Sequence, residues 1–317
     1  MLSLAPSAFL ASAESTERLQ ALILSQFSPP VDPCIQLALS VWSLGHASAP
    51  PLGLAATSQR AWDQIGTAAA KSRLWADLPS PRDQARLLAT SAPHASDWLY
   101  ALPITTCGLR LEDEAIRVAI GLRLGLPICE PHPCSCGSLV EALGTHCLSC
   151  RRGSGRITRH QQLNDLLWRA LGRAKIPAVK EPSGLARTDG KRPDGMSLIP
   201  WRMGRCLIWD VTVTDTLAAS YVHLTSVSHG AAAEGAASRK IAKYADLATT
   251  RCFIPLAIET LGPICESGVS LLDDLGSRLM SVTGDPRERA FLYQRLSIAI
   301  QRGNSICFSN SFSSAGC

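Results

Sequence analysis

Four residues that commonly bind metals lie close together near the middle of the sequence: Cys134, Cys136, His146 and Cys150. Thiolate and imidazole groups in so short a segment are the usual ligands of tetrahedral zinc. The segment has few large apolar side chains that would stabilise it in another way. The pattern therefore predicts a structural zinc knuckle, because protein side chains fill every coordination position.

Other residues in the same segment offer different ligand sets. Cys147, Cys129 and His132 could each replace one of the ligands named above. The Cys-x-Cys start is less common than Cys-x-x-Cys, so the spacing by itself leaves these alternatives open. A cysteine-rich loop without metal is a further alternative. We prefer the first set and expect Zn²⁺ as its ion.

Three acidic residues occupy particular positions in the strands expected after the knuckle. Glu181 ends one strand, Asp194 begins the next, and Asp210 lies within the third. A turn centred near Arg202 would place Asp194 opposite Asp210, with Cβ atoms about 5 Å apart. Two carboxylates this close repel each other unless a cation joins them. Oxygen ligands favour Mg²⁺ or Mn²⁺, which could polarise a phosphodiester and position water.

The helix expected after these strands supplies the basic group that such chemistry needs. Lys240 and Lys243 are three residues apart and therefore close together on the helix surface. A lysine beside the acid pair would contact the scissile phosphate or the attacking water. The candidate catalytic residues are thus Glu181, Asp194, Asp210, Lys240 and Lys243. In the alternative interpretation, the acids cap turns or make structural hydrogen bonds, and the lysines are solvated.

A concentrated positive charge follows the cysteine-rich segment. Residues 151–180 contain eight Lys and Arg side chains and one acid, which is +7 in a chain whose total charge is only +5. Such a stretch on an otherwise near-neutral protein is typical of an anionic partner, first of all nucleic acid. A solvated helix face is the alternative. The candidate contacts to nucleic acid are Arg151, Arg152, Arg156, Arg159, His160, Arg169, Arg173 and Arg192.

The elements that position these side chains alternate between helix and strand. Thr158 with Gln161 is a capping-box pattern that predicts the start of a helix, and apolar residues from Leu163 to Ala174 recur at helical spacing. The expected order from 158 to 259 is helix, strand, strand, strand, helix, strand. The expected strands are 178–181, 193–200, 205–213 and 252–259, and an alanine-rich helix is expected at 231–249.

The N-terminal part shows no comparable chemistry. Residues 1–100 are expected to be mostly helical, and Ser80 before a proline predicts one helix start. Acids begin a helix expected at 111–124, and Gly125 ends it. The tryptophans expected in the core are Trp62, Trp75 and Trp98.

Composition excludes several classes of protein. The chain has 317 residues, 46% hydrophobic and 18% charged, which excludes wholesale disorder and suggests two domains. Twelve cysteines in a chain of this length, without a convincing secretory signal, indicate a reducing compartment rather than disulfides. The longest apolar stretch, 35–44, is too short to cross a bilayer. We expect an intracellular protein that has no membrane segment.

Taken in order, these motifs resemble a known family. Arg192-Pro-Asp194, followed by Asp210 and a lysine on the next helix, is similar to the PD-(D/E)XK restriction-enzyme-like nucleases. With the preceding CCHC knuckle and the Arg159-His160 helix, the order resembles the C-terminal part of the polyprotein of non-LTR retrotransposons that carry a restriction-like endonuclease. Stretches such as 190–195 and 209–214 also look like reverse-transcriptase-associated reading frames. The resemblance covers about residues 87 to 308.

The resemblance implies a Mg²⁺-dependent endonuclease that nicks target DNA in the nucleus, with DNA and the element's RNA as partners. The sequence departs from the family pattern in two places. Thr212 stands where the usual (D/E)-x-K motif has lysine, which leaves the choice between Lys240 and Lys243 open, and no Tyr-x-Asp-Asp polymerase signature occurs. A catalytically decayed, zinc-dependent nucleic-acid-binding module is the second hypothesis, and a purely structural role is the third.

We therefore expect a mixed α+β or α/β chain with a restriction-endonuclease-like αβββαβ core. The expected segments are a helical region at 1–128 that is the remnant following a polymerase, a CCHC zinc knuckle at 129–156, a PD-(D/E)XK nuclease-like core at 157–262 and C-terminal helices at 263–317.

Overall fold

The computed structural model describes the chain except for residues 1–5, 25–32, 45–48, 186–191 and 313–317. The chain divides into two compact units, Met1–Leu78 and Pro79–Cys317. The second unit contains the last part of the region 1–128 together with all three segments expected after it. Gly190 and Lys191, which precede the Arg-Pro-Asp motif, lie outside the described residues.

The first unit is a cluster of helices around two tryptophans. Trp42 and Trp62 are buried and pack edge to face, with ring centroids 5.1 Å apart. The indole N–H of Trp62 donates to the Ala56 carbonyl over 2.8 Å. The core role predicted for Trp62 is confirmed, but the same prediction for Trp75 is wrong, because Trp75 lies exposed in the last turn of its helix. The helices are α1 (Pro6–Leu24), α2 (Pro33–Leu44) and α3 (Gln59–Ala76).

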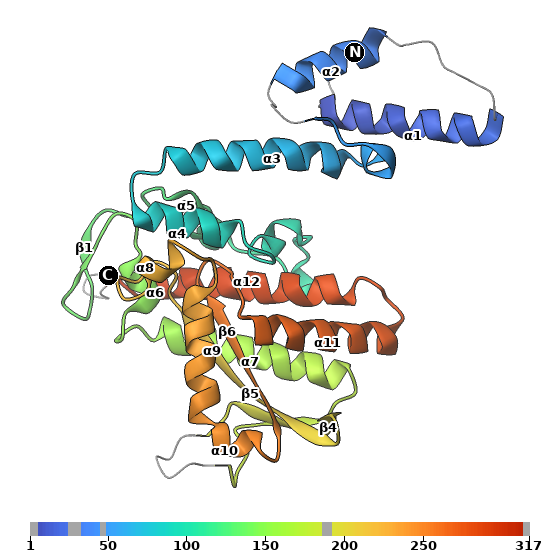
Figure 1. The fold of residues 1–317 in the computed structure, drawn as a ribbon. Coiled ribbons are helices and arrows are strands. Elements are labelled where there is room, and N and C mark those ends of the chain that lie inside the picture. The colour runs from blue at the N-terminus through green and yellow to red at the C-terminus, as the bar shows by residue number, and fades with distance from the viewer. Residues whose placement is uncertain (1–5, 25–32, 45–48, 186–191, 313–317) are drawn as a thin grey trace. The chain divides into compact units, whose positions relative to one another are not determined.

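A four-stranded sheet lies at the centre of the second unit (Figure 1). Its strands, in spatial order, are β3 (Ala178–Lys180), β4 (Gly195–Arg202), β5 (Arg205–Thr214) and β6 (Cys252–Glu259). The first three strands are antiparallel neighbours, whereas β6 runs parallel to β5. The connection to β6 contains α9 (Ala231–Lys243), between the single-turn helices α8 (Val222–Thr225) and α10 (Ala245–Ala248).

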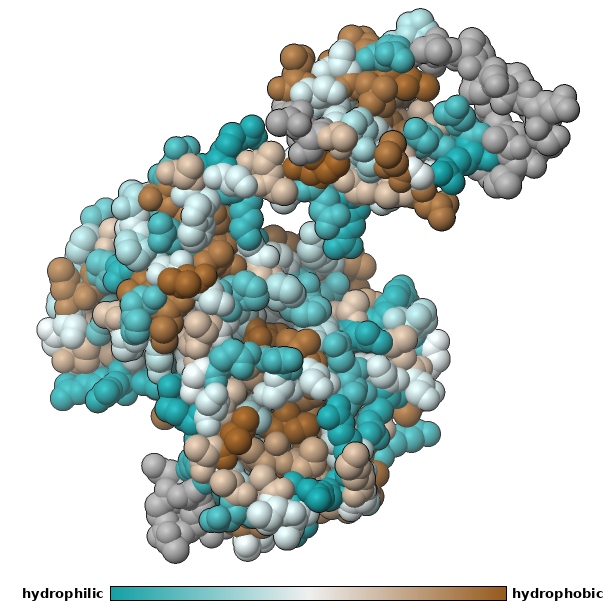
Figure 2. Space-filling model, viewed as in Figure 1, coloured by the Kyte–Doolittle hydropathy of each residue, from teal (hydrophilic) through white to brown (hydrophobic). Residues whose placement is uncertain are grey.

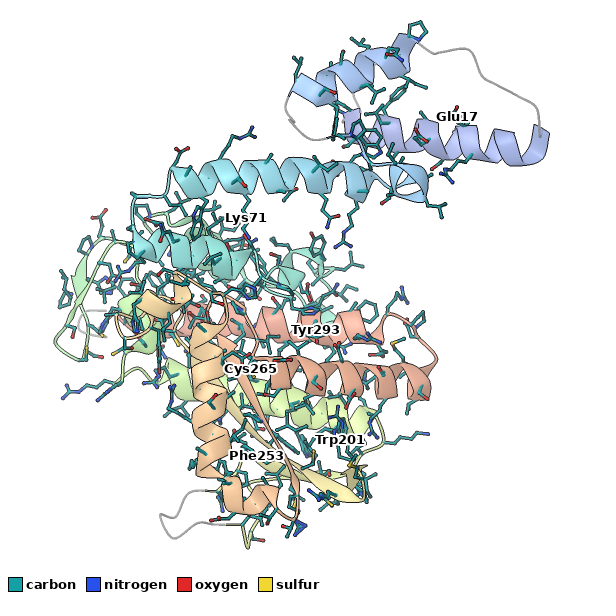
Figure 3. All side chains as sticks on the ribbon, viewed as in Figure 1. Glu17, Lys71, Trp201, Phe253, Cys265 and Tyr293 are labelled. Atoms are coloured by element: carbon teal, nitrogen blue, oxygen red, sulfur yellow. The ribbon has the colours of Figure 1, made fainter. Side chains whose placement is uncertain are left out.

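Alternation along β5 separates the two faces of this sheet. Leu207, Trp209 and Val211 are buried in a core shared with α7 (Gly155–Arg173), α11 (Glu266–Thr283) and α12 (Glu288–Ser309). On the other face, alanines of α9 pack against Ala257 of β6 and against Cys265, which Figure 3 labels beside α9. Because successive strand side chains point to opposite faces, Asp210 lies on the α9 face.

Local signals set several of the helix ends. The Ser80 hydroxyl accepts the Asp83 N–H over 3.2 Å at the start of α4 (Pro81–Thr90). Gly125, with φ +71°, ends α5 (Asp113–Leu124) in the left-handed conformation that glycine tolerates best. The predicted capping box is wrong: α7 begins at Gly155, so Thr158 already lies in its first turn and donates its N–H to the Ser154 carbonyl.

A second core joins the cysteine-rich segment to elements far away in the sequence. Ala85 of α4, Val118 of α5 and Phe308 of α12 are buried together with Cys147 and Leu148 of the cysteine-rich segment. Trp98 is buried in a neighbouring cluster beside Ile298 of α12, as predicted for a core residue. The cysteine-rich segment is therefore an integrated part of the second unit.

The architecture is mixed α/β, with twelve α-helices, a four-stranded sheet and a two-stranded sheet in the described part of the chain. Apart from the single-turn helices α8 and α10, the helices and strands from α7 to β6 follow the predicted order. No helix among the described residues is long and apolar enough to span a membrane. On the face shown in Figure 2, hydrophobic residues form separate patches between hydrophilic ones.

Candidate functional site

The predicted zinc ligands are presented by a small hairpin and a helical turn. Strands β1 (His132–Pro133) and β2 (Leu139–Val140) pair, and the turn between them carries Cys134 and Cys136. Gly137 closes this turn with φ +89°, and its N–H donates to the Cys134 carbonyl over 2.8 Å. The short helix α6 (His146–Ser149) and the residue after it carry the other two ligands.

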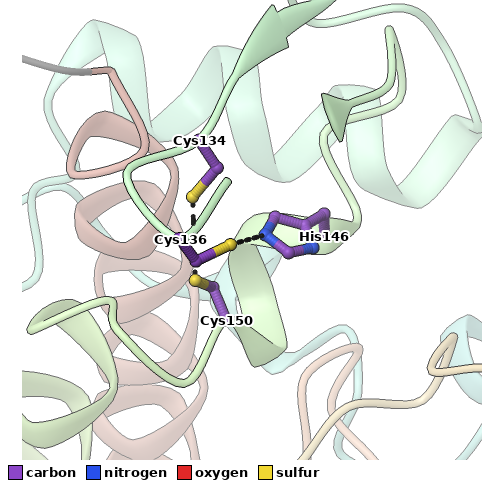
Figure 4. A group of neighbouring side chains, drawn as sticks. All are labelled: Cys134, Cys136, His146 and Cys150. Carbon is purple, nitrogen blue, oxygen red and sulfur yellow. Dashed lines mark hydrogen bonds between the residues drawn. The ribbon is translucent and has the colours of Figure 1, made fainter. Parts of the chain in front are cut away.

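The four ligand atoms converge at distances that fit a tetrahedral ion (Figure 4). The Sγ atoms of Cys134 and Cys150 are 3.7 Å apart, and Cys136 Sγ lies 3.2 Å from His146 Nε2. All four atoms lie within 4.8 Å of one another. With zinc–sulfur bonds of about 2.3 Å, two tetrahedral sulfur ligands lie roughly 3.8 Å apart. The predicted set is therefore brought together as a group that could hold zinc.

Position rather than thiol pKa separates these ligands from the competing residues, because burial raises the pKa of the ligand Cys150 as well. Hydrogen bonds from Ser138 lower the pKa of Cys136 to about 6, which favours the thiolate that binds metal. Burial raises the pKa of Cys147 to about 12 and keeps it a neutral core residue. Cys129 points its Sγ at the carbonyls of Glu141 and Ala142, and burial raises its pKa as well. His132 stacks on Phe312 and hydrogen-bonds Ser311, away from the cluster.

The acid pair lies where the hairpin geometry predicted it. Gly195 pairs with Trp209 and Met196 with Ile208, so the same register places Asp194 opposite Asp210. The Asp194 N–H donates to the Trp209 carbonyl over 3.1 Å, which extends the ladder to this position. The register shifts only nearer the turn, between Met196 and Arg202. The two carboxylates thus face each other at the end of β4.

Each carboxylate already has basic or polar partners within the protein. Lys240 Nζ lies 2.5 Å from Asp210 Oδ1, and His160 Nε2 lies 2.9 Å from Asp194 Oδ2. The same Asp194 oxygen accepts the Val211 N–H over 2.6 Å. The helices α9 and α7 therefore each contribute one basic side chain to the acid pair.

Burial and mutual repulsion govern the charges at this site. Burial, and next the negative charge of Asp194, raise the pKa of Asp210, while Lys240 lowers it. The hydrogen bond to Asp194 raises the pKa of His160. The net rise for Asp210 shows that Lys240 does not fully offset burial and repulsion.

Two of the five candidate catalytic residues lie apart from this centre. The Glu181 side chain is 62% exposed and forms an ion pair with Arg192, and only its backbone N–H reaches Asp194, at the carbonyl, over 2.9 Å. Lys243 lies over the Tyr244 ring and donates to its hydroxyl over 3.0 Å. Of the two lysines, Lys240 is therefore the one that reaches the acid pair.

A basic groove opens beside the acid pair. It has a volume of about 650 Å³ and is lined by residues 151–154 and 156–157, by Arg159 and His160, by the β5 residues Val211, Thr212 and Val213, and by Lys240. Arg151, Arg152 and Arg156 are exposed along its wall. The groove thus combines the N-terminal end of α7, the residues just after Cys150 and the α9 lysine.

The predicted nucleic-acid contacts divide into three groups. Arg151, Arg152, Arg156 and His160 line the groove. Arg169 and Arg173 lie towards the other end of α7, where Arg173 pairs with Glu288. Arg192 pairs with Glu181 on an exposed loop.

The prediction for Arg159 is wrong. Its side chain is only 2% exposed and donates to Asn304 Oδ1 over 2.7 Å and to the Leu148 carbonyl over 3.0 Å. Those bonds occupy the guanidinium within the protein and leave no free face for a phosphate. The sequence predicted an exposed Arg159 because an arginine among other basic residues is normally solvated. In the structure, Arg159 lies on the buried face of α7.

Two further residues, neither of them among the five candidate catalytic residues, build the site. Asn164, one turn after His160, accepts the Trp209 indole N–H over 2.7 Å and donates to the Asp194 carbonyl over 3.5 Å. Tyr244 is buried and hydrogen-bonds Asp210, which lowers the pKa of that carboxyl. The spacing of Asn164 from His160 was the one available signal, since residues four apart share a helix face.

One group of side chains in the described part of the chain could hold a metal ion. Among the described residues, the Cys134 cluster is the only group of three or more His, Cys, Asp or Glu side chains close enough to share an ion. The acid pair supplies two carboxylates and does not form such a group. The chain matches no protein-family model and no curated protein sequence, so the interpretation depends on this geometry.

Proposed function

We propose that the chain is a metal-dependent DNA endonuclease of the PD-(D/E)XK restriction-like type, from a non-LTR retrotransposon, with a structural zinc knuckle beside its cleavage site. The observation that carries the proposal is the acid pair: Asp194 and Asp210 face each other next to Lys240, at the edge of an arginine-lined groove. A buried and a half-buried carboxylate, a lysine and a positively charged groove wall are the parts that phosphodiester hydrolysis needs.

In this proposal, Asp194 and Asp210 hold Mg²⁺ or Mn²⁺. The ion, when bound, supplies Lewis acidity and a water of lowered pKa. His160 and the Val211 N–H fix Asp194 Oδ2 in place, so one oxygen of this carboxylate is positioned by the protein. Lys240, 2.5 Å from Asp210 in the protein alone, would then be free to offset negative charge on the scissile phosphate.

The position of Lys240 accounts for the departure at Thr212. Both residues line the same groove, although Thr212 belongs to β5 and Lys240 to α9. A lysine from the neighbouring helix can thus deliver its ammonium to the place where the usual motif would deliver one from the strand. The threonine does not by itself exclude catalysis.

The groove supplies the grip on nucleic acid. Arg151, Arg152 and Arg156 are exposed and would contact backbone phosphates, so affinity would fall steeply with salt. The partners are DNA and, second, the element's RNA, and the place of action is the nucleus. The zinc knuckle ends at Cys150, directly before these arginines, and would hold the wall of the groove in place.

The direct test is nicking of supercoiled plasmid by the zinc-loaded chain with Mg²⁺. We expect relaxed circles with the wild type and a loss of at least about a hundredfold in rate for Asp194→Asn, which removes a metal-binding charge. Arg205→Gln, an exposed arginine outside the groove, is the matched control. Plasmid that stays supercoiled with wild-type protein, or nicking that survives Asp194→Asn, overturns the assignment.

The second candidate is a zinc-dependent nucleic-acid-binding module without catalysis. One observation favours it: both carboxylates already have partners, and no third acidic, histidine or cysteine ligand joins them among the described residues. This alternative predicts salt-sensitive DNA binding that Asp194→Asn leaves intact or strengthens, with no cleavage in Mg²⁺ or Mn²⁺. Binding and nicking measured on the same protein separate the two candidates.

A further inference from the structure

A second basic site lies along α7, outside the groove. The hollow has a volume of about 300 Å³ and is formed mainly by two helix faces. Gln162 and Arg169 come from α7, and Arg295, Ala299 and Arg302 come from α12. Each set recurs at helical spacing, so the side chains of each helix point to one side. The small Ala299 leaves room between the two arginines of α12.

This hollow and the groove face different directions. Arg169 follows His160 by nine residues, which is two and a half helical turns, so the two side chains leave α7 on opposite sides. The groove is lined by residues 151–160 of this region and the hollow by residues from Gln162 onwards. An anion in the hollow would therefore not be an anion bound at the acid pair.

Positive charge in and beside the hollow exceeds the negative charge available to offset it. Arg173 and Arg295 share the carboxylate of Glu288, the latter over 3.9 Å. Asp165 is taken by Lys180 at 2.5 Å. Arg169 and Arg302 form no ion pair with any residue in the described part of the chain. The five basic side chains in and beside the hollow therefore have only two carboxylates, Glu288 and Asp165, to offset their charge.

Crowding of like charges is visible at Arg295. Burial, and next the positive charge of Arg173, lower the pKa of this guanidinium, so a nearby anion would relieve both effects. Arg302 uses Nη2 to hold the carbonyls of Gly108 and Arg110, over 3.2 and 2.9 Å, which fixes its guanidinium at the rim. Guanidinium carries five N–H donors, so further donors remain for a ligand.

A polar group without a partner completes the lining. Gln162 Oε1 is buried and has no hydrogen-bond partner. Such an oxygen is costly unless a donor reaches it, and rotation of the amide presents two N–H donors instead. Either orientation suits a ligand that carries both oxygen acceptors and a hydroxyl.

We propose that this hollow, formed by Gln162, Arg169, Arg295 and Arg302, is a phosphate-binding site separate from the acid-pair groove. Planar guanidinium groups bind phosphate oxygens in pairs, and several arginines around one cavity favour a multiply charged anion. The phosphate group belongs either to a nucleic-acid backbone that continues past α7 or to a small phosphate ester. The site does not depend on whether the chain cleaves DNA.

The test is titration of the full-length, zinc-loaded chain with inorganic phosphate at low ionic strength, followed by calorimetry. We expect wild-type binding in the millimolar range or tighter and a loss of about tenfold in affinity for Arg169→Gln, which removes one charged hydrogen-bonding group. Arg169 is exposed, so this variant should fold normally. Arg205→Gln, an exposed arginine that lines neither cavity, is the control and should bind phosphate as the wild type does.

Two outcomes overturn the proposal: no phosphate binding by the wild type, or equal binding by Arg169→Gln and Arg205→Gln. A single-stranded oligonucleotide then identifies the source of the phosphate. Displacement of phosphate by the oligonucleotide assigns the hollow to the nucleic-acid footprint, whereas simultaneous binding assigns it to a small phosphate ester. Asp194→Asn should bind phosphate in the hollow normally even where it abolishes nicking, which separates this proposal from the proposed function.

Discussion

At the residue scale, the acid pair shows how a strained arrangement of charge is held in place. Asp210 is buried on the α9 face of β5, and Asp194 faces it from the end of β4. Lys240 and His160 each neutralise one carboxylate, and backbone N–H groups fix the geometry further. Both carboxylates therefore have partners within the protein itself.

Lys240→Ala should destabilise the protein by about 1–3 kcal/mol, because a buried carboxylate loses its charged partner. The pKa of Asp210 is already raised by burial, and the variant would raise it further. The folded variant would then favour the protonated acid, so the destabilisation should grow as pH rises through that pKa. Urea unfolding at several pH values measures this.

Lys243→Ala is the comparison for this prediction, because Lys243 contacts Tyr244, whereas Lys240 forms the ion pair with Asp210. We expect Lys243→Ala to lower the free energy of unfolding less than Lys240→Ala does, and by an amount that does not change with pH. Equal effects from both substitutions would contradict the assignment of Lys240 as the Asp210 partner.

His160→Gln should lose stability mainly on the acidic side. The hydrogen bond to Asp194 raises the pKa of His160, so the imidazolium pair contributes fully below the ordinary histidine pKa and disappears as pH rises through the raised value. Because the histidine is partly exposed, about 0.5 kcal/mol is expected. Unfolding of wild type, His160→Gln and the exposed control His223→Gln should be compared from acidic to mildly alkaline pH. A difference that grows with rising pH would contradict the expected sign.

At the element scale, a hydrogen bond joins the cysteine-rich segment to the first half of α7. Leu148 of α6 gives its carbonyl to the buried Arg159 of α7, which also binds Asn304 of α12. The aliphatic part of Arg159 packs against Gly303, where any side chain would collide with it. The arginines 151, 152 and 156 lie between Cys150 and this anchor, so both ends of the groove wall are fixed.

Zinc removal should therefore loosen the groove as well as the knuckle. We expect one zinc per chain in wild type, loss of that zinc in Cys136→Ser, and a fall of at least about tenfold in DNA affinity with it. Cys129→Ser, a cysteine outside the cluster, should retain the metal and the affinity. Elemental analysis and salt-dependent binding measure the two effects. If the zinc-free variant kept its DNA affinity, the groove would not depend on the zinc knuckle, and this prediction would be wrong.

At the scale of the whole molecule, the second unit folds around interactions between distant segments. Ala85 and Val118 lie in the same core as Cys147, Leu148 and Phe308. A boundary at residue 129, chosen from composition, would cut through that core. The compact unit instead begins at Pro79.

A fragment comprising residues 79–317 should consequently fold, bind zinc and retain the activity of the full chain. A fragment that begins at 129 should be destabilised by several kcal/mol or fail to fold, because α4 and α5 no longer cover the second core. Circular dichroism and thermal unfolding of both fragments test this. A stable, zinc-loaded 129–317 fragment would contradict the expected boundary.

The sequence predicted most where chemistry depends on neighbours in the chain. The zinc ligands lie within one short segment. The turn predicted near Arg202 placed Asp194 opposite Asp210, but the observed turn lies between Arg202 and Arg205, and the pairing holds because the register shifts between Met196 and Arg202. The sequence predicted least about which side of a helix is buried. Arg159 and Arg156 are both arginines with similar neighbours in the sequence, yet Arg159 is buried and Arg156 is exposed. Only packing against α12 distinguishes them.

The sequence by itself determined the ligand types and the order of helices and strands, because each follows from local spacing and side-chain chemistry. Tertiary structure alone decided that Lys240 rather than Lys243 meets Asp210 and that Glu181 faces solvent. It also divided the basic run of 151–180 between two sites and one buried anchor. The physical reason is that these outcomes depend on which face of α7 or α9 meets the sheet and α12, and distant residues set that contact.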